Sequence, residues 1–147
     1  MDLFWLVLAV GAGGCIALQA AANGSLRGNI DSVWYAAFYS ICGTILTAVL
    51  FMLFARPSAP SVAAVRAAPW WNWIGGPLGA TVGLAGAALN PRLGATVFAA
   101  AFVGGQLVFS LLLDHYGWMD LPRESLTAGR LAGAAMVFAG MLMVRYL

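Results

Sequence analysis

Apolar residues fill almost the whole chain and are interrupted only by short polar segments. The pattern divides into five apolar stretches, at residues 3–22, 33–54, 73–89, 93–113 and 127–144. A helix rises about 1.5 Å per residue, so about 20 apolar residues cross the ~30 Å hydrocarbon core of a bilayer. Four stretches have or approach that length, and residues 73–89 are slightly short of it. The pattern predicts an all-α integral membrane protein with one five-helix transmembrane domain in the lipid bilayer.

Composition agrees with this fold and excludes several classes of function. The 147 residues are 63% hydrophobic and 8% charged, and the mean hydropathy is +0.90. A single His and the absence of metal-binding, phosphate-binding or nucleophile motifs argue against an enzyme, a cofactor or a metal site. The lack of a basic cluster argues against binding to nucleic acid.

Short polar segments predict the connections between the spans. We expect a loop over residues 23–32, a longer loop over residues 55–72 that contains a short helix at Val62–Ala68, and a tight turn at residues 90–92. Small residues recur every four positions within the spans and predict close helix packing. In the third span these are Gly75, Gly79, Gly83 and Ala87, and in the first span Ala9, Gly13, Ala17 and Ala21.

Basic residues near the span ends normally set the orientation of a membrane protein. All seven are Arg. Four fall on the face of the N-terminus (Arg56, Arg66, Arg123 and Arg130) and three on the opposite face (Arg27, Arg92 and Arg145). One interpretation is insertion one way with a weak bias. The other is insertion in both orientations, with copies pairing as an antiparallel, inverted homodimer.

Polar residues inside the spans are the main candidates for a site, because each costs free energy unless it finds a partner or water. Gln19 and Asn23 share one face of the first span, and Gln106, Ser110 and Asp114 follow a four-residue step on the fourth. We predict that Gln19, Asn23, Gln106 and Ser110 line a cavity. The alternative is that they only form interhelical hydrogen bonds, worth about 0.6 kcal/mol each. For the hydroxyls of Ser40, Thr44 and Thr47 this structural interpretation is favoured, because a hydroxyl can also bond back to its own helix.

Asp114 and His115 form the one candidate for a titrating group or gate. They lie at the end of the fourth span, and His is the side chain that changes charge near neutral pH. The alternative is that the pair caps a helix end at the lipid headgroups.

Several runs resemble those of the YdcZ-like proteins, a branch of the drug/metabolite transporter superfamily. They are QAAANGSLR at residues 19–27, GGPLGA at 75–80, PRLGA at 91–95, and GQL at 105–107 leading into DHYG at 114–117. The resemblance covers nearly the whole chain in the same order. It implies a bacterial inner-membrane protein that is half of a ten-helix, inverted-repeat transporter and works as a dimer. The nearly even Arg count is similar to that of single-gene members with dual orientation.

Together these features predict a small-solute transporter that works by alternating access as an inverted homodimer, with a small-molecule substrate. Half of a heterodimeric transporter is one alternative, and a non-transporting scaffold subunit is another. This sequence lacks the first-span carboxylate of the small multidrug exporters, so proton-coupled export of organic cations is not expected.

Overall fold

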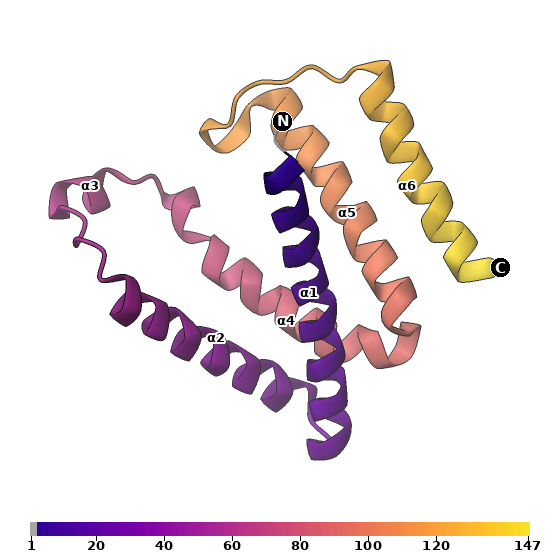
Figure 1. The fold of residues 1–147 in the computed structure, drawn as a ribbon, viewed down its shortest axis with the longest axis horizontal. Coiled ribbons are helices and arrows are strands. Elements are labelled where there is room, and N and C mark those ends of the chain that lie inside the picture. The colour runs from indigo at the N-terminus through magenta and orange to yellow at the C-terminus, as the bar shows by residue number, and fades with distance from the viewer. Residues whose placement is uncertain (1–2) are drawn as a thin grey trace. The chain divides into compact units, whose positions relative to one another are not determined.

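The structure of the protein is a computed structural model that describes residues 3–147. Within these residues it consists of helices and contains no strand, so the predicted all-α fold is confirmed (Figure 1). The long helices are α1 (Leu3–Ile30), α2 (Val33–Ala55), α4 (Gly75–Leu93), α5 (Ala95–Tyr116) and α6 (Ala128–Tyr146). The short elements are α3 (Val62–Ala67) and the 3-10 helices η1 (Trp70–Trp73) and η2 (Trp118–Asp120). The chain divides into two compact units, of which the first ends at Pro91 and the second begins at Arg92.

Four of the long helices are long and apolar enough to cross a membrane, and these are α1, α2, α5 and α6. Helix α4 has 19 residues, which at about 1.5 Å per residue is close to the thickness of the hydrocarbon core. Its many glycines, together with Asn90, Pro91 and Arg92, make it less hydrophobic than the other four. The described residues therefore contain four candidate membrane-spanning helices where the sequence predicts five.

Helix α1 continues beyond the predicted end of the first span. Instead of a loop over residues 23–32, the helix reaches Ile30, and only Asp31 and Ser32 separate it from α2. Ser32 caps α2, because its hydroxyl oxygen accepts a hydrogen bond from the backbone N–H of Tyr35. Asn23 and Gly24 have weak helix propensity, but both are buried, and tertiary contact outweighs propensity here.

The connection predicted at residues 90–92 also lies further along the chain. Pro91 and Arg92 belong to the last turn of α4, and the helical path ends at Gly94. Gly94 has a φ of 81°, a left-handed conformation that a residue without a Cβ adopts at little cost. The predicted short helix at Val62–Ala68 is present as α3, and the hydroxyl oxygen of Ser61 caps it.

Helices α1 and α4 approach each other closely where both carry small residues. A Cβ atom added to Gly86 would lie 3.3 Å from the Cα of Ala20, and one added to Gly24 would lie 3.0 Å from the Cγ of Pro91. Ala20, Gly24 and Gly86 are all buried. Small residues allow this contact, which is how helices associate where no water drives them together. We refer to this contact as the α1–α4 crossing.

The glycines predicted for helix packing occupy two different environments. Gly83 is buried, and Ala87 one turn later is completely buried. Gly75 and Gly79 are exposed, and a Cβ added to either would meet no atom within 4 Å. The close contact in the described chain is made by Gly86, which the four-residue pattern does not include. The role of Gly75 and Gly79 therefore stays a prediction.

The second unit is built on the contact between α5 and α6. Gly104 of α5 lies against the ring of Phe138 of α6, so that a Cβ at residue 104 would lie 3.4 Å from the ring. Phe98, Gly104 and Ala134 are the buried residues of these two helices. Small and aromatic side chains thus interlock along the hairpin.

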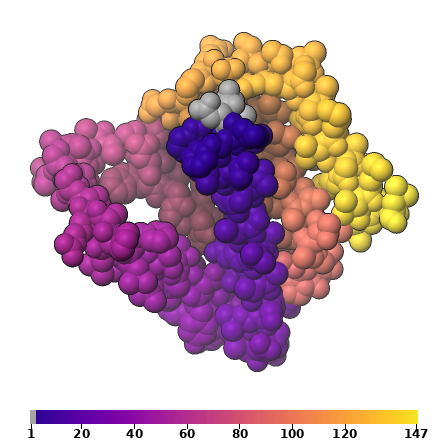
Figure 2. All heavy atoms as spheres, viewed as in Figure 1, coloured from indigo at the N-terminus to yellow at the C-terminus, as the bar shows by residue number. Residues whose placement is uncertain are grey.

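Large apolar side chains lie mostly on the outside of the single chain. Figure 2 draws the atoms of α1 and α2 in indigo and purple. Many residues of these two helices are large, apolar and exposed, and Phe54 is 93% exposed. A contiguous surface of this kind is unfavourable in water but is the normal outer surface of a helix in hydrocarbon. With four membrane-length helices, this makes the chain a multi-pass membrane protein.

The α1–α4 crossing predicts opposite effects for two glycine substitutions on the same helix. Gly24→Ala places a methyl group against the rigid ring of Pro91 and should destabilise the protein by about 1–3 kcal/mol. Gly28→Ala meets nothing within 4 Å and should be neutral or stabilising by up to about 1 kcal/mol, because Ala favours a helix. Unfolding in mixed micelles by increasing denaturing detergent measures both. Equal stabilities of the two variants would contradict the crossing.

Candidate functional site

The α1–α4 crossing contains the most buried polar side chains in the described residues. Asn23 of α1 is 6% exposed and Asn90 of α4 is 8% exposed. The side-chain nitrogen Nδ2 of Asn23 is buried and has no hydrogen-bond partner among residues 3–147. A buried donor without a partner costs about 1–3 kcal/mol, so this group is far from its optimal environment. Sequence reasoning did not select Asn90, because it placed this residue in the turn at residues 90–92, directly after the predicted third span.

Gln19 lies one turn before Asn23 on α1 but has a different environment. Its position is exposed, because the close contact with α4 begins only at Ala20. The two amides were predicted to share one cavity. In the described chain, Asn23 is buried and Gln19 is exposed.

Gln106 and Ser110 lie one turn apart on α5, and both are exposed. They come before Asp114 on the same helix, so the predicted four-residue stripe is present in the helical register. Gln106 thus exposes an amide on the surface of a membrane-length helix. An amide facing lipid is unfavourable, and another chain, water or a solute would relieve this.

Asp114 is part of a charged cluster that ties the end of α5 to the start of α6. Its carboxylate lies 3.4 Å from a guanidinium nitrogen of Arg130, which is 3.5 Å from the carboxylate of Glu124. The backbone N–H of Glu124 also donates to the carbonyl oxygen of Asp114 at 2.8 Å. Asp114 is therefore an ion-paired residue at a helix end. The sequence showed Arg130 close to a span boundary but gave no sign of its two partners.

His115 takes part in the same connection through its backbone. The Nε of Arg123 donates a hydrogen bond of 3.0 Å to the carbonyl oxygen of His115. The ring nitrogen Nδ1 of His115 is buried without a hydrogen-bond partner in the described chain, and so is one guanidinium nitrogen of Arg130. The cluster therefore holds unpaired hydrogen-bonding capacity beside its ion pairs.

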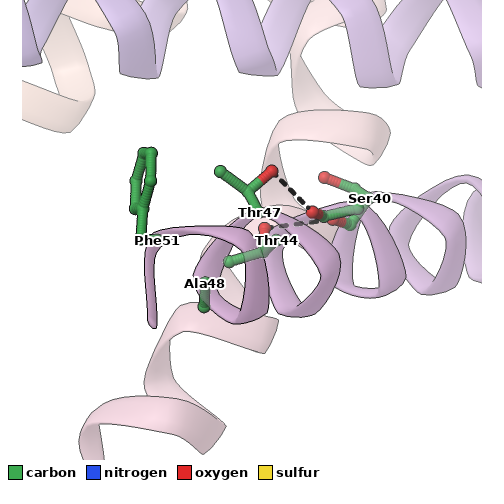
Figure 3. Close-up of a pocket in the computed structure, with 6 residues that line it drawn as sticks. Ser40, Thr44, Thr47, Ala48 and Phe51 are labelled. Carbon is green, nitrogen blue, oxygen red and sulfur yellow. Dashed lines mark hydrogen bonds between the residues drawn. The ribbon is translucent and has the colours of Figure 1, made fainter. Parts of the chain in front are cut away.

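An open groove of about 430 Å³ runs along one side of α2. It is lined by Ser40, Gly43, Thr44, Thr47, Ala48 and Phe51 (Figure 3). The hydroxyl of Thr44 donates to the carbonyl oxygen of Ser40 at 3.0 Å, and that of Thr47 donates to Gly43 at 2.9 Å. Both threonine hydroxyls therefore bond back to their own helix, the possibility that favours a structural role for them. The groove consequently presents hydroxyl oxygens as acceptors but no free hydroxyl donor from these threonines.

The amides and hydroxyls described above can recognise a solute by hydrogen bonds. The charged side chains lie at the ends of helices. Within residues 3–147, no three His, Cys, Asp or Glu side chains are grouped so that they could hold a metal ion. Both cysteines, Cys15 and Cys42, are free.

The charged cluster predicts a loss of stability when Arg130 is removed. Arg130→Leu leaves Asp114 and Glu124 without their cation, and because all three side chains are at least a third exposed we expect a loss of about 1 kcal/mol. Arg145→Leu, at the other end of α6, removes a cation that stacks on Tyr146 and should cost less. Detergent-induced unfolding compares the two variants. A double-mutant cycle of Arg130→Leu with Asp114→Asn that shows no coupling would contradict the ion pair.

Comparison with known proteins identifies the family of the chain. A family model described as "Putative inner membrane exporter, YdcZ" matches residues 4–143. Neither a curated protein nor a solved structure matches the chain. The matched residues extend from the first turn of α1 almost to the end of α6, which agrees with the helical membrane architecture. The chain therefore belongs to the YdcZ family of the drug/metabolite transporter superfamily, whose model is described as that of an inner-membrane exporter.

Proposed function

We propose that this protein is a small-solute carrier that works by alternating access as an inverted homodimer. The observation that carries the proposal is the exposure of Gln19 and Gln106 on membrane-length helices of the single chain. Amides in such positions require partners that lipid does not supply. A second copy of the chain and a water-filled path for the solute would supply such partners.

Helix α4 supports a five-helix protomer, half of a ten-helix assembly. It is long enough to cross the hydrocarbon core, and its low hydropathy suits a helix that is covered by protein. Gly83, Gly86, Ala87 and Asn90 are buried, as such a role requires. We therefore assign α4 as the fifth crossing in addition to the four apolar helices.

Inversion places the two exposed amides in the same leaflet. On the predicted spans 3–22 and 93–113, Gln19 lies near the second end of the first span, and Gln106 lies past the middle of the fourth, toward the face of the N-terminus. When one protomer is turned over, its Gln19 comes to the leaflet of the partner's Gln106. This pairing suits transporters built from inverted repeats around a site near the midplane.

The basic residues support insertion in both orientations. With five crossings, four Arg lie on one face and three on the other, as the sequence predicts. The orientation signal is then nearly balanced.

The cluster of Asp114, Arg130 and Glu124 is suited to be a gate in this scheme. Asp114 and His115 lie at the end of α5, beyond Gln106 and Ser110 on the same helix. Breaking the ion pair would let α5 and α6 separate at this end. The family description supports the outward direction of transport, across a bacterial inner membrane.

Two C-terminal reporters test the inverted homodimer. One reporter is active only in the cytoplasm and the other only outside, and we expect comparable signals from both. Adding two Lys residues to the loop after α2 should shift the signal to one side, because cytoplasmic loops retain positive charge. A one-sided signal from the unaltered chain would contradict the inverted homodimer.

Flux through purified protein in liposomes tests transport itself. A suitable panel is succinamide, succinate and putrescine, which share a four-carbon chain and differ in charge and in oxygen atoms. Gln106→Leu should lower flux at least about tenfold through the loss of a polar cavity group, while the protein stays dimeric. Phe109→Leu, on the exposed surface of the same helix, is the matched control and should leave flux unchanged. A scaffold would instead show no flux above empty liposomes with any of the three.

A further inference from the structure

Asn23 differs from the exposed amides in which groups can form a hydrogen bond with it. Its Nδ2 is buried and unpartnered, and the residue is only 6% exposed. Because it is enclosed within its own chain, neither lipid nor a second protomer reaches it from outside. A group that pairs with this nitrogen must be small, and it must enter when α1 and α4 separate.

Pro91 adds a second incomplete group to the same place. Proline has no N–H, so the carbonyl oxygen of Ala87, four residues earlier in α4, lacks its usual helical donor. Ala87 is completely buried. The ring of Pro91 lies against Gly24, the neighbour of Asn23. The crossing therefore contains an unpaired donor and an acceptor that has lost its regular partner.

The charges near the crossing restrict the kind of solute. From Leu3 to Pro91 the sequence contains one acidic residue, Asp31, which lies in the turn between α1 and α2. Arg27 lies one turn after Asn23 on α1. A cation would find no counter-charge within the helices of this unit and would meet a positive charge at the end of α1. A solute with an acceptor oxygen meets a donor and no repulsion.

We infer that the α1–α4 crossing is the solute-anchoring site of the carrier, and that its ligand is a small neutral or anionic solute with a carbonyl or carboxylate oxygen. Asn23 Nδ2 donates to that oxygen, and the carbonyl oxygen of Ala87 accepts from a donor of the solute where one is present. The separation of Gly24 from Pro91 opens the site. This inference rests on the proposed carrier function and adds the class of its substrate.

Side-chain amide signals in nuclear magnetic resonance test binding directly. The chain contains four Asn and two Gln, so only six such groups must be assigned, each by its own variant. On titration of the intact protein in micelles, we expect succinamide or succinate to shift the Asn23 signal in a saturable way, and putrescine to leave it unchanged. Succinamide and succinate distinguish a neutral from an anionic ligand. An unchanged Asn23 signal with both, or an equal shift with putrescine, would overturn the inference.

Transport by two Asn variants separates this inference from the carrier function. Asn23→Leu should lower flux of the oxygen-bearing solute about tenfold, while stability is kept or raised because an unpaired buried amide is removed. Asn29→Leu, at an exposed position of the same helix, should transport normally. If the unaltered protein moves putrescine best and Asn23→Leu matches it, the inference fails and the carrier stands. If none of the three solutes moves, the carrier function fails.

Discussion

The hydrocarbon core supplies no hydrogen bonds, and this constraint orders the whole molecule. Backbone groups are satisfied within helices, so the described chain is helical from α1 to α6. Thr44 and Thr47 are satisfied by carbonyl groups of their own helix. A side-chain amide is not satisfied by one such bond, because it offers two donors and an acceptor. The positions of the amides therefore carry the functional information, and they divide into exposed and enclosed groups.

The close contact of α1 with α4 explains why one amide is enclosed. Ala20 meets Gly86, and Gly24 meets Pro91, so the helices touch almost at the backbone. Asn23 lies between Ala20 and Gly24 in the sequence of α1, and it is buried. Gln19, just before the contact, stays outside. The same small residues thus determine the packing and separate a buried amide from an exposed one.

The sequence predicts features that depend on local composition and misses those that depend on contacts. Four of the five predicted spans and the short helix predicted at residues 62–68 follow from local composition, and they are present, the short helix over residues 62–67. The length of α1 does not follow, because Asn23 and Gly24 resemble helix-ending residues until their burial against α4 is known. The stripe from Gln106 to Asp114 follows from helical periodicity. The pairing of Asp114 with Arg130 does not, because a turn of unknown path separates them.

The charged side chains and the buried amides lie in different parts of the chain, and this bears on mechanism. The ionic cluster lies where α5 ends and α6 begins, whereas the amides of α1 and α4 lie inside a helix crossing. An ion pair that is at least a third exposed contributes little to stability and can break at small cost, which suits a gate. A buried amide without a partner has the opposite property, because a hydrogen bond with a matching group removes a large free-energy cost. In a carrier of this design, the buried amide would select the solute, and the ion pair would hold α5 and α6 together until it breaks.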